Sequence, residues 1–268
     1  MRWLLPSQSG AALVSGAPIH YGAVGGRATI AGTVEHWSGE HAMALIATAA
    51  VAALLVAAAR RWGDTWAVPA GRALAVVILA AFVCEQLTYA LRGQWTAQVN
   101  LPLQLSDAVT LVSVAALWRP QAALLVELVY FWALSASLQA VLTPDVGQSF
   151  PDLLFFTYFV THSGALAAAC LLVFGMRRAP CPNAVWRVYA TTLAFTCVAA
   201  AGTLLTGGNY MFLRHKPARG SLLEFMGPWP VYILVAALLA LVMFLALAAL
   251  ARPISARSLH GTIGRKTG

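Results

Sequence analysis

Charged residues are scarce in this chain. Asp, Glu, Lys and Arg make up 10% of its 268 residues, whereas 60% of the residues are hydrophobic, and the mean hydropathy is +0.75. A soluble domain usually carries about 25% charged residues, so this chain has too few to cover the surface of one. The composition therefore excludes a soluble globular fold and predicts an all-α, polytopic membrane protein.

Several functional signatures are missing as well. The four cysteines form no CxxC pair, and their positions in apolar segments favour small buried hydrophobic side chains over a redox or metal motif. The net charge of +8 is not gathered into a basic stripe with interleaved aromatics, which argues against nucleic-acid binding. The excess of arginine is better explained by loops that set the orientation in the membrane.

Apolar runs of about 20 residues, the length that crosses the hydrocarbon core, predict seven transmembrane helices. They cover residues 41–59, 72–91, 101–118, 121–142, 153–175, 185–206 and 229–250. Residues 1–35 are rich in Ala, Gly and Ser and lack a sustained apolar run, so we expect them to be disordered or to reflect a misassigned start. Residues 36–251 are expected to form the transmembrane domain, and 252–268 a basic cytoplasmic tail.

The distribution of Lys and Arg predicts the orientation of these spans. With seven spans, one side of the membrane receives six of these residues and the other receives eleven. Because cytoplasmic loops carry the excess of positive charge, the N-terminus is predicted outside and the C-terminus in the cytoplasm.

Polar residues interrupt the outer half of the third span. Asn100, Gln104 and Asp107 are spaced by four and three residues, which would place them on one face of a helix. Pro102 would sit in the first turn of that helix, where its missing amide donor is tolerated. A polar group at membrane depth is costly unless it is paired or hydrated, so this face is expected to line a wet cavity.

The other spans add polar residues on the same side of the membrane. Glu85 and Arg92 on the second span are either a buried ion pair or part of the site, and His162 lies near the midplane of the fifth span. The inner halves are poorer, with Glu127 as the main exception. We therefore predict a polar cavity that opens toward the outer leaflet. Its predicted substrate-binding residues are His41, Gln104, Gln139, Asp145, Asn209, Tyr210 and Lys216.

The predicted cavity holds the parts of an acyl-transfer site, which needs a nucleophile, a base and a group that orients the base. His162 is the candidate base, and Asp107 or Glu85 would orient it. The hydroxyl candidates are Ser106, Thr161 and Thr143. The GxSxG elbow of soluble lipases is absent.

Two other functions stay open. The stretch "EHWSGEH" (35–41) lacks the HExxH spacing, but with His162 and His215 it could contribute to a composite metal site; no metal or cofactor is expected. A carrier or transporter of a lipid or small polar solute is the second alternative. Paired broken helices in two halves of the chain, which mark many transporters, are not evident, so the one-sided cavity favours an enzyme or a lipid-binding protein.

Three stretches together resemble the YwaF-like family of bacterial integral membrane proteins. They are "LPLQLSD" (101–107), "YFWALSASLQAVLTPD" (130–145) and "NYMFLRHKPARGSLLEFMGPWPVY" (209–232), joined by the histidine at the head of the first span and the one in "FVTHSG". The resemblance covers roughly residues 36–250. It implies a multi-pass protein of the bacterial inner membrane.

That family is more distantly similar to a eukaryotic multi-span transacylase of ether phospholipids, and to the androgen-induced and ADTRP-type hydrolases of fatty-acid esters. Those relatives are described as using a nucleophile on one span and a histidine on a later one, and the histidine corresponds to His162. The transacylase has a cysteine at the position of Leu103, and bacterial relatives often have a cysteine at the position of Ser106. The resemblance thus implies acyl transfer between membrane lipids, with Ser106 as the nucleophile.

Overall fold

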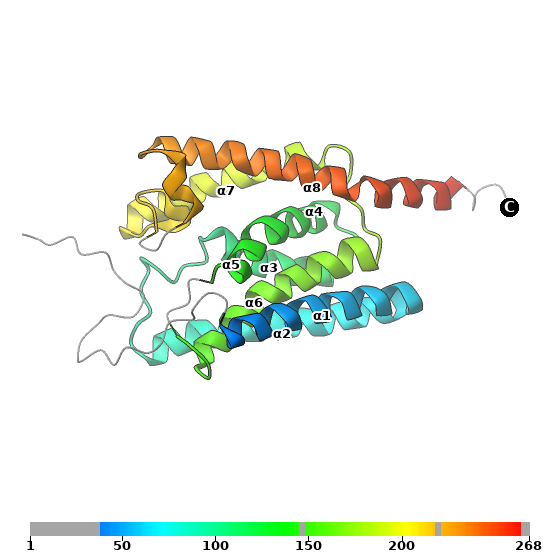
Figure 1. The fold of residues 1–268 in the computed structure, drawn as a ribbon, viewed down its shortest axis with the longest axis horizontal. Coiled ribbons are helices and arrows are strands. Elements are labelled where there is room, and N and C mark those ends of the chain that lie inside the picture. The colour runs from blue at the N-terminus through cyan, green and yellow to red at the C-terminus, as the bar shows by residue number, and fades with distance from the viewer. Residues whose placement is uncertain (1–37, 145–147, 218–220, 264–268) are drawn as a thin grey trace, which may run out of the picture.

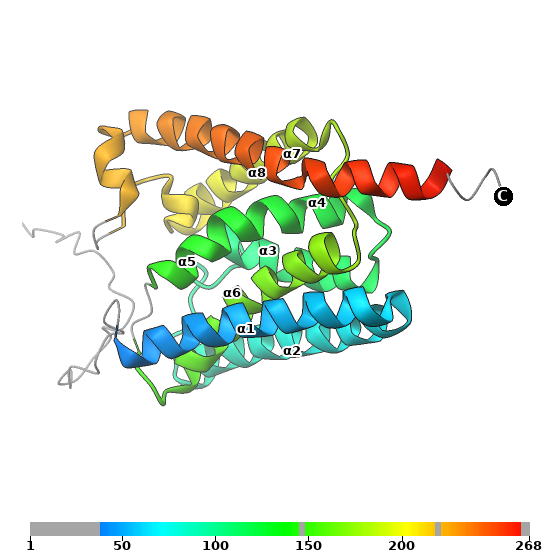
Figure 2. The same ribbon diagram turned by 45° about the vertical axis from the view of Figure 1, so that its right-hand side comes forward.

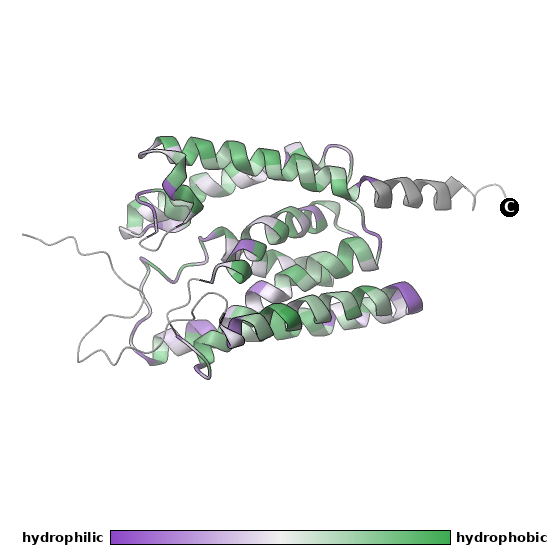
Figure 3. Ribbon diagram, viewed as in Figure 1, coloured by the Kyte–Doolittle hydropathy of each residue, from purple (hydrophilic) through white to green (hydrophobic). Residues whose placement is uncertain are grey.

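The computed structural model describes residues 38–144, 148–217 and 221–263. All regular elements in these ranges are helical. Within them, six helices are long and apolar enough to cross a membrane, and a seventh is apolar but shorter. The chain is therefore a polytopic membrane protein, as its composition predicts. Figure 3 shows apolar residues along the helices and hydrophilic ones gathered toward their ends.

The seven spans follow one another along the chain as α-helices, two of them with π-helical turns. The first three are α1 (Gly39–Trp62), α2 (Asp64–Leu91) and the short α3 (Leu105–Trp118). The fourth is continuous through α4 (Ala123–Trp132), the π-helical η1 (Ala133–Ser137) and α5 (Leu138–Leu142). The fifth joins α6 (Leu153–Ala169) to the π-helical η2 (Cys170–Gly175). The last two are α7 (Ala184–Thr206) and α8 (Val231–Ile263), and the loop between them carries the 3₁₀ turns η3 (Tyr210–Phe212) and η4 (Leu222–Met226).

The fifth span forms the centre of the bundle. In its most apolar stretch 72% of the residues are buried, against 6% for α1 and for α8, and α6 contacts α1, α2, α3, α4, η1 and α5. Figures 1 and 2 show α1 with α2 on one side of this centre and α7 with α8 on the other. Side chains on α6 are therefore the best placed to meet residues from several spans.

The predicted boundaries hold for most spans, but the second span begins earlier than expected. The stretch 60–71 was predicted to be a connection, whereas the structure continues as helix up to Trp62 and resumes at Asp64. Gly63 alone makes the turn, with φ of 69°, a value that glycine adopts at little cost. Pro69 lies inside α2, in its second turn, where it removes one intrahelical hydrogen bond.

The third span begins later than predicted. The helix begins at Leu105, so Pro102 precedes α3 instead of standing in its first turn, and Asn100 and Gln104 do not share a helical face with Asp107. Asn100 Oδ1 instead accepts a hydrogen bond from the Thr96 amide at 2.9 Å. The residue before a proline is disfavoured in helical geometry, and the side-chain bonds of this segment stabilise a non-helical path.

An ion pair joins α4 to α7 at the other end of the bundle. Glu127 is buried, with 1% of its side chain exposed, and its Oε1 lies 2.5 Å from Nη2 of Arg187, which is 45% exposed. The carboxylate also accepts the amide of Cys181 at 3.0 Å. Glu127, the polar residue that the sequence places in the inner half of the membrane, therefore joins two helices through an ion pair.

We expect the two halves of this pair to differ in their effect on stability. Arg187→Met leaves a buried carboxylate without a counter-charge and should cost about 3 kcal/mol, the low end for a buried pair. Glu127→Gln leaves only a half-exposed arginine and should cost less. Thermal unfolding of both variants in detergent measures the order, and equal losses would contradict it.

Candidate functional site

One face of α2 packs against α3 and α6. On this face Ile78 lies against Gly164, where an added Cβ would come within 2.6 Å of Ile78 Cγ1. Fourteen residues further on, Arg92 binds Asp152 Oδ2 at 3.0 Å, just before α6 begins. Residues seven apart return to nearly the same side of a helix. The face that carries Ile78 and Arg92 is therefore directed at α6 over the whole outer half of α2.

Glu85 belongs to this face. It lies seven residues after Ile78 and seven before Arg92. Tyr158 lies six residues before Gly164, which contacts Ile78, and six after Asp152, which binds Arg92. Because the two helices run antiparallel, Glu85 and Tyr158 lie at the same height. His162 lies one helical turn deeper on α6. We call the contact between α2, α3 and α6 the seam; Glu85 enters it from α2. His162 is two residues from Gly164 and therefore points to another side of α6, where its ring stacks on Tyr158.

Of the two alternatives for Glu85 and Arg92, the ion pair between them does not form, because Arg92 pairs with Asp152. Arg92 follows the last residue of α2 and reaches across to Asp152, whose side chain also caps α6 by accepting the Leu154 amide at 2.8 Å. A carboxylate at a helix N-terminus is favourably placed, and Asp152 lies within reach of Arg92 where the chain leaves α2. Among the described residues Glu85 makes no ion pair. Sequence reasoning missed Asp152, although an Asp before an apolar run is a helix-start signal.

Asp107 enters the seam from the first turn of α3. It is the third residue of the helix, and its carboxylate accepts a hydrogen bond from the backbone of Gln104, the N-cap residue. This is half of a capping box, which stabilises the start of a helix. Glu85 and Asp107 act on each other electrostatically, and both act on Tyr89. Glu85 and Tyr89 of α2 and Asp107 of α3 therefore form one cluster.

His162 is held in one tautomer by its own helix. Its Nδ1 lies 2.8 Å from the carbonyl oxygen of Tyr158, and a carbonyl only accepts, so Nδ1 carries the proton. The ring also stacks on Tyr158, with centroids 4.2 Å apart, and the Tyr158 hydroxyl donates to Ala140 O at 2.9 Å. Nε2 is left with its lone pair and no hydrogen-bond partner among the described residues. Sequence reasoning missed this role of Tyr158, which the i−4 spacing could have suggested.

Ser106 is the second residue of α3 and half-buried. Its hydroxyl makes no hydrogen bond with the described residues, unlike that of Thr161, which donates to Thr157 O at 2.9 Å. The first amides of a helix have no intrahelical acceptor, and the N-cap residue Gln104 supplies none from its side chain. The start of α3 is therefore an electropositive position next to a free hydroxyl.

Asn209, Tyr210 and Lys216, which were predicted to bind substrate, instead hold the 207–216 loop in its conformation. Tyr210 is fully buried, and its hydroxyl donates to Ala97 O at 2.6 Å and accepts the Leu101 amide at 3.1 Å. Burial raises the pKa of Tyr210, and the negative charge of Asp107 adds to this shift. Gln104 Oε1 accepts the Met211 amide at 2.8 Å. These contacts tie the loop to the segment that leads into α3.

Asn209 has a similar role within the loop. Its Oδ1 accepts the Arg214 amide at 2.9 Å, and its Nδ2 donates to His215 O at 2.8 Å. Lys216 Nζ donates to Glu224 O at 3.3 Å and lies 5.5 Å from the centroid of the Tyr232 ring. Both side chains hold the turns of this loop together.

The remaining predicted residues do not meet in the seam. His41 is buried, and its Nε2 is 2.8 Å from Val141 O, which joins α1 to α5. Gln139 is exposed on α5, and Asp145 lies outside the described residues. Glu35 and His36 of the composite metal site also lie outside them. In the part of the chain that the structure describes, no three His, Cys, Asp or Glu side chains are grouped for a metal ion.

Comparison with known proteins identifies one family. The model of the TMEM164 family matches residues 35–248, a range that covers the first six spans and most of the apolar part of α8. No curated protein and no solved structure matches the chain.

We predict that Tyr210→Phe weakens the loop clamp. The substitution leaves the half-buried Ala97 carbonyl and Leu101 amide without their partner, which should cost about 1 kcal/mol, the low end for such a loss. Limited proteolysis in detergent should cut the 207–232 loop faster than in the wild type. Tyr189→Phe on α7 is the matched control, because the Tyr189 hydroxyl makes no hydrogen bond with the described residues. Equal protection of both variants would contradict the clamp.

Proposed function

The chain belongs to the TMEM164 family of transmembrane proteins, and we propose that it is an intramembrane acyltransferase or lipid-ester hydrolase. The observation that carries the proposal is the state of His162. Its Nδ1 is bound to Tyr158 O, so its free Nε2 is a buried base held by packing and hydrogen bonding on the central helix α6. A base of this kind is what a hydroxyl nucleophile requires.

In the proposed reaction Ser106 attacks the carbonyl carbon of an acyl ester. Its proton passes to His162 Nε2 while the Oγ–carbon bond forms, and the carbonyl oxygen becomes negative. The first amides of α3 stabilise that charge. The ester C–O bond then breaks, and the imidazolium returns the proton to the leaving oxygen. An acceptor hydroxyl or water repeats these steps to release the acyl group from Ser106.

The two carboxyl groups have different roles in this scheme. Asp107 accepts the Gln104 backbone donor and so fixes the turn that carries Ser106; it is a positioning residue. Glu85 interacts electrostatically with Asp107, so in this scheme it acts on the site through Asp107 and not through the imidazole. The Tyr158 carbonyl continues to accept the Nδ1 proton throughout.

The substrate proposed for this site is a phospholipid or another fatty-acyl ester. The seam lies in the same half of the bundle as the 207–232 loop, which is the outer half in the predicted orientation. We therefore propose that substrates enter from the outer leaflet of a bacterial cell membrane. At the opposite end of the bundle Glu127 is paired with Arg187 and is not available to a solute. A carrier needs polar groups at both ends of its path, so this pairing supports an enzyme over a carrier.

The test is acyl transfer by purified protein in liposomes that contain isotope-labelled diacyl phospholipid and an unlabelled lysolipid. Mass spectrometry should find the label on the acceptor lipid, or as free fatty acid, with the wild type. His162→Ala should lower the rate at least ~100-fold, because a general base contributes about that much or more. Ser106→Ala should do the same.

Ser135→Ala is the matched control for Ser106→Ala. Ser135 is also half-buried in a span, but its hydroxyl is bonded to Phe131 O at 2.7 Å, so this variant should keep the wild-type rate. Thermal unfolding must show that each variant is folded. A folded His162→Ala protein with the wild-type rate would overturn the assignment of the base. No label movement by the wild type across several lipid classes would favour the carrier.

A further inference from the structure

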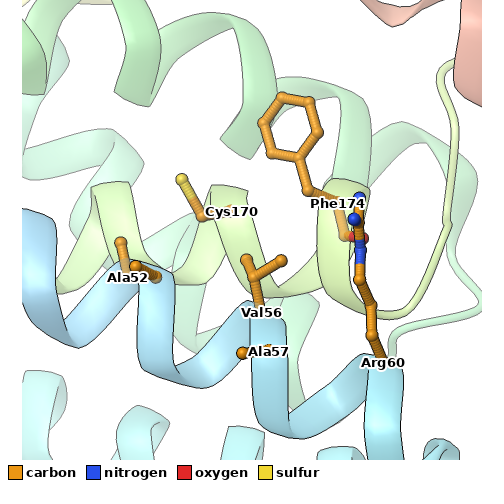
Figure 4. Close-up of a pocket in the computed structure, with 7 residues that line it drawn as sticks. Ala52, Val56, Ala57, Arg60, Cys170 and Phe174 are labelled. Atoms are coloured by element: carbon orange, nitrogen blue, oxygen red, sulfur yellow. The ribbon is translucent and has the colours of Figure 1, made fainter.

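A second site lies between α1 and η2, away from the seam. A groove there is lined on the α1 side by small and branched apolar residues and on the other side by two residues of the π-helical turn, with an arginine at one end (Figure 4). Its lining residues are Ala52, Ala53, Val56, Ala57, Arg60, Cys170 and Phe174. Cys170 is eight residues beyond His162 on the same span, about 12 Å deeper along the helix axis.

Small side chains shape this groove. At its arginine end the two helices approach closely, since a Cβ added to Gly175 would lie 3.0 Å from Ala59 Cβ and 3.6 Å from Val56 Cα. Ala53 and Ala57 are exposed, whereas Val56 is half-buried. The groove is therefore apolar and open toward the outside of the bundle, where lipid tails lie.

Arg60 is oriented by the end of η2. Its Nε donates to Phe174 O at 3.1 Å, one of the last carbonyls of the span, which have no intrahelical donor. Neither terminal nitrogen of Arg60 has a partner among the described residues. Arg60 is in the last turn of α1, at the depth where headgroups begin. A guanidinium with two free N–H edges there suits a phosphate, which it can bind with two hydrogen bonds.

We propose that this groove binds one acyl chain of an anionic phospholipid whose phosphate is bound by Arg60. The lipid comes from the leaflet at the end of α1 that carries Arg60, which is the cytoplasmic leaflet in the predicted orientation. It is a retained ligand and is distinct from the substrate of the proposed acyl transfer. Alanine-rich faces also favour contact with a second helix. However, the described carboxylates at this end, Asp64 and Glu127, already pair with Arg178 and Arg187. A second copy of the chain would therefore offer Arg60 no free counter-charge, whereas a phosphate supplies one.

The proposal is tested by native mass spectrometry of protein released from bilayers of phosphatidylglycerol and phosphatidylcholine in equal amounts. The wild type should retain one phosphatidylglycerol in preference to phosphatidylcholine. Arg60→Gln should lower that preference at least fivefold. Val56→Trp should fill the groove and abolish retention of both lipids. Arg61→Gln is the matched control, because Arg61 is the next residue and exposed but does not line the groove.

Each other outcome overturns the proposal. If Arg60→Gln keeps the wild-type preference, Arg60 does not bind the headgroup. If Arg61→Gln lowers the preference for phosphatidylglycerol as much as Arg60→Gln does, the preference reflects surface charge and not the groove. A dimer in the wild type that is lost in Val56→Trp would identify a second copy as the occupant. Circular dichroism of each variant shows whether it is folded. If Val56→Trp is not folded, Val56→Ala replaces it; this variant widens the groove and should retain the lipid.

Discussion

Hydrocarbon offers no water to a polar group, and the rest of this structure depends on that constraint. Backbone groups satisfy it by forming helices, and most side chains in the spans satisfy it through nearby carbonyls. Hydroxyls such as that of Thr161 donate to their own helix, while His41 reaches a carbonyl of another span. The buried carboxylate of Glu127 has an arginine. Polar groups that lack such a partner therefore identify where chemistry is to be sought.

The seam between α2, α3 and α6 contains such groups. The Ser106 hydroxyl on α3 has no partner among the described residues, and neither has His162 Nε2 on α6, while Glu85 and Asp107 come from α2 and α3. The central α6 contacts both of the other helices. The 207–216 loop has a supporting role: through Tyr210 it fixes the segment that leads into α3, and hence the turn on which Ser106 stands.

The two proposed lipid sites lie at different depths of the same span. His162 lies in the outer half of α6, and Cys170 lines the groove beside α1, about 12 Å further along the axis. Both sites adjoin places where the backbone departs from regular α-helix: α3 begins late beside the seam, and η2 is π-helical beside the groove. π-helical turns often occur at functional sites. An anionic lipid on Arg60 would thus contact the helix that carries the proposed base.

The sequence by itself determined the seven spans, their order and the half of the bundle that holds most polar residues, because hydrophobic length is a local property. It also singled out His162, since an imidazole in an apolar run is conspicuous. Tertiary structure decided the partners: Asp152 and not Glu85 binds Arg92, Tyr210 holds the approach to α3, and Pro102 lies before that helix. Such choices depend on which residues of distant segments meet, and hydrophobic periodicity carries no information about that.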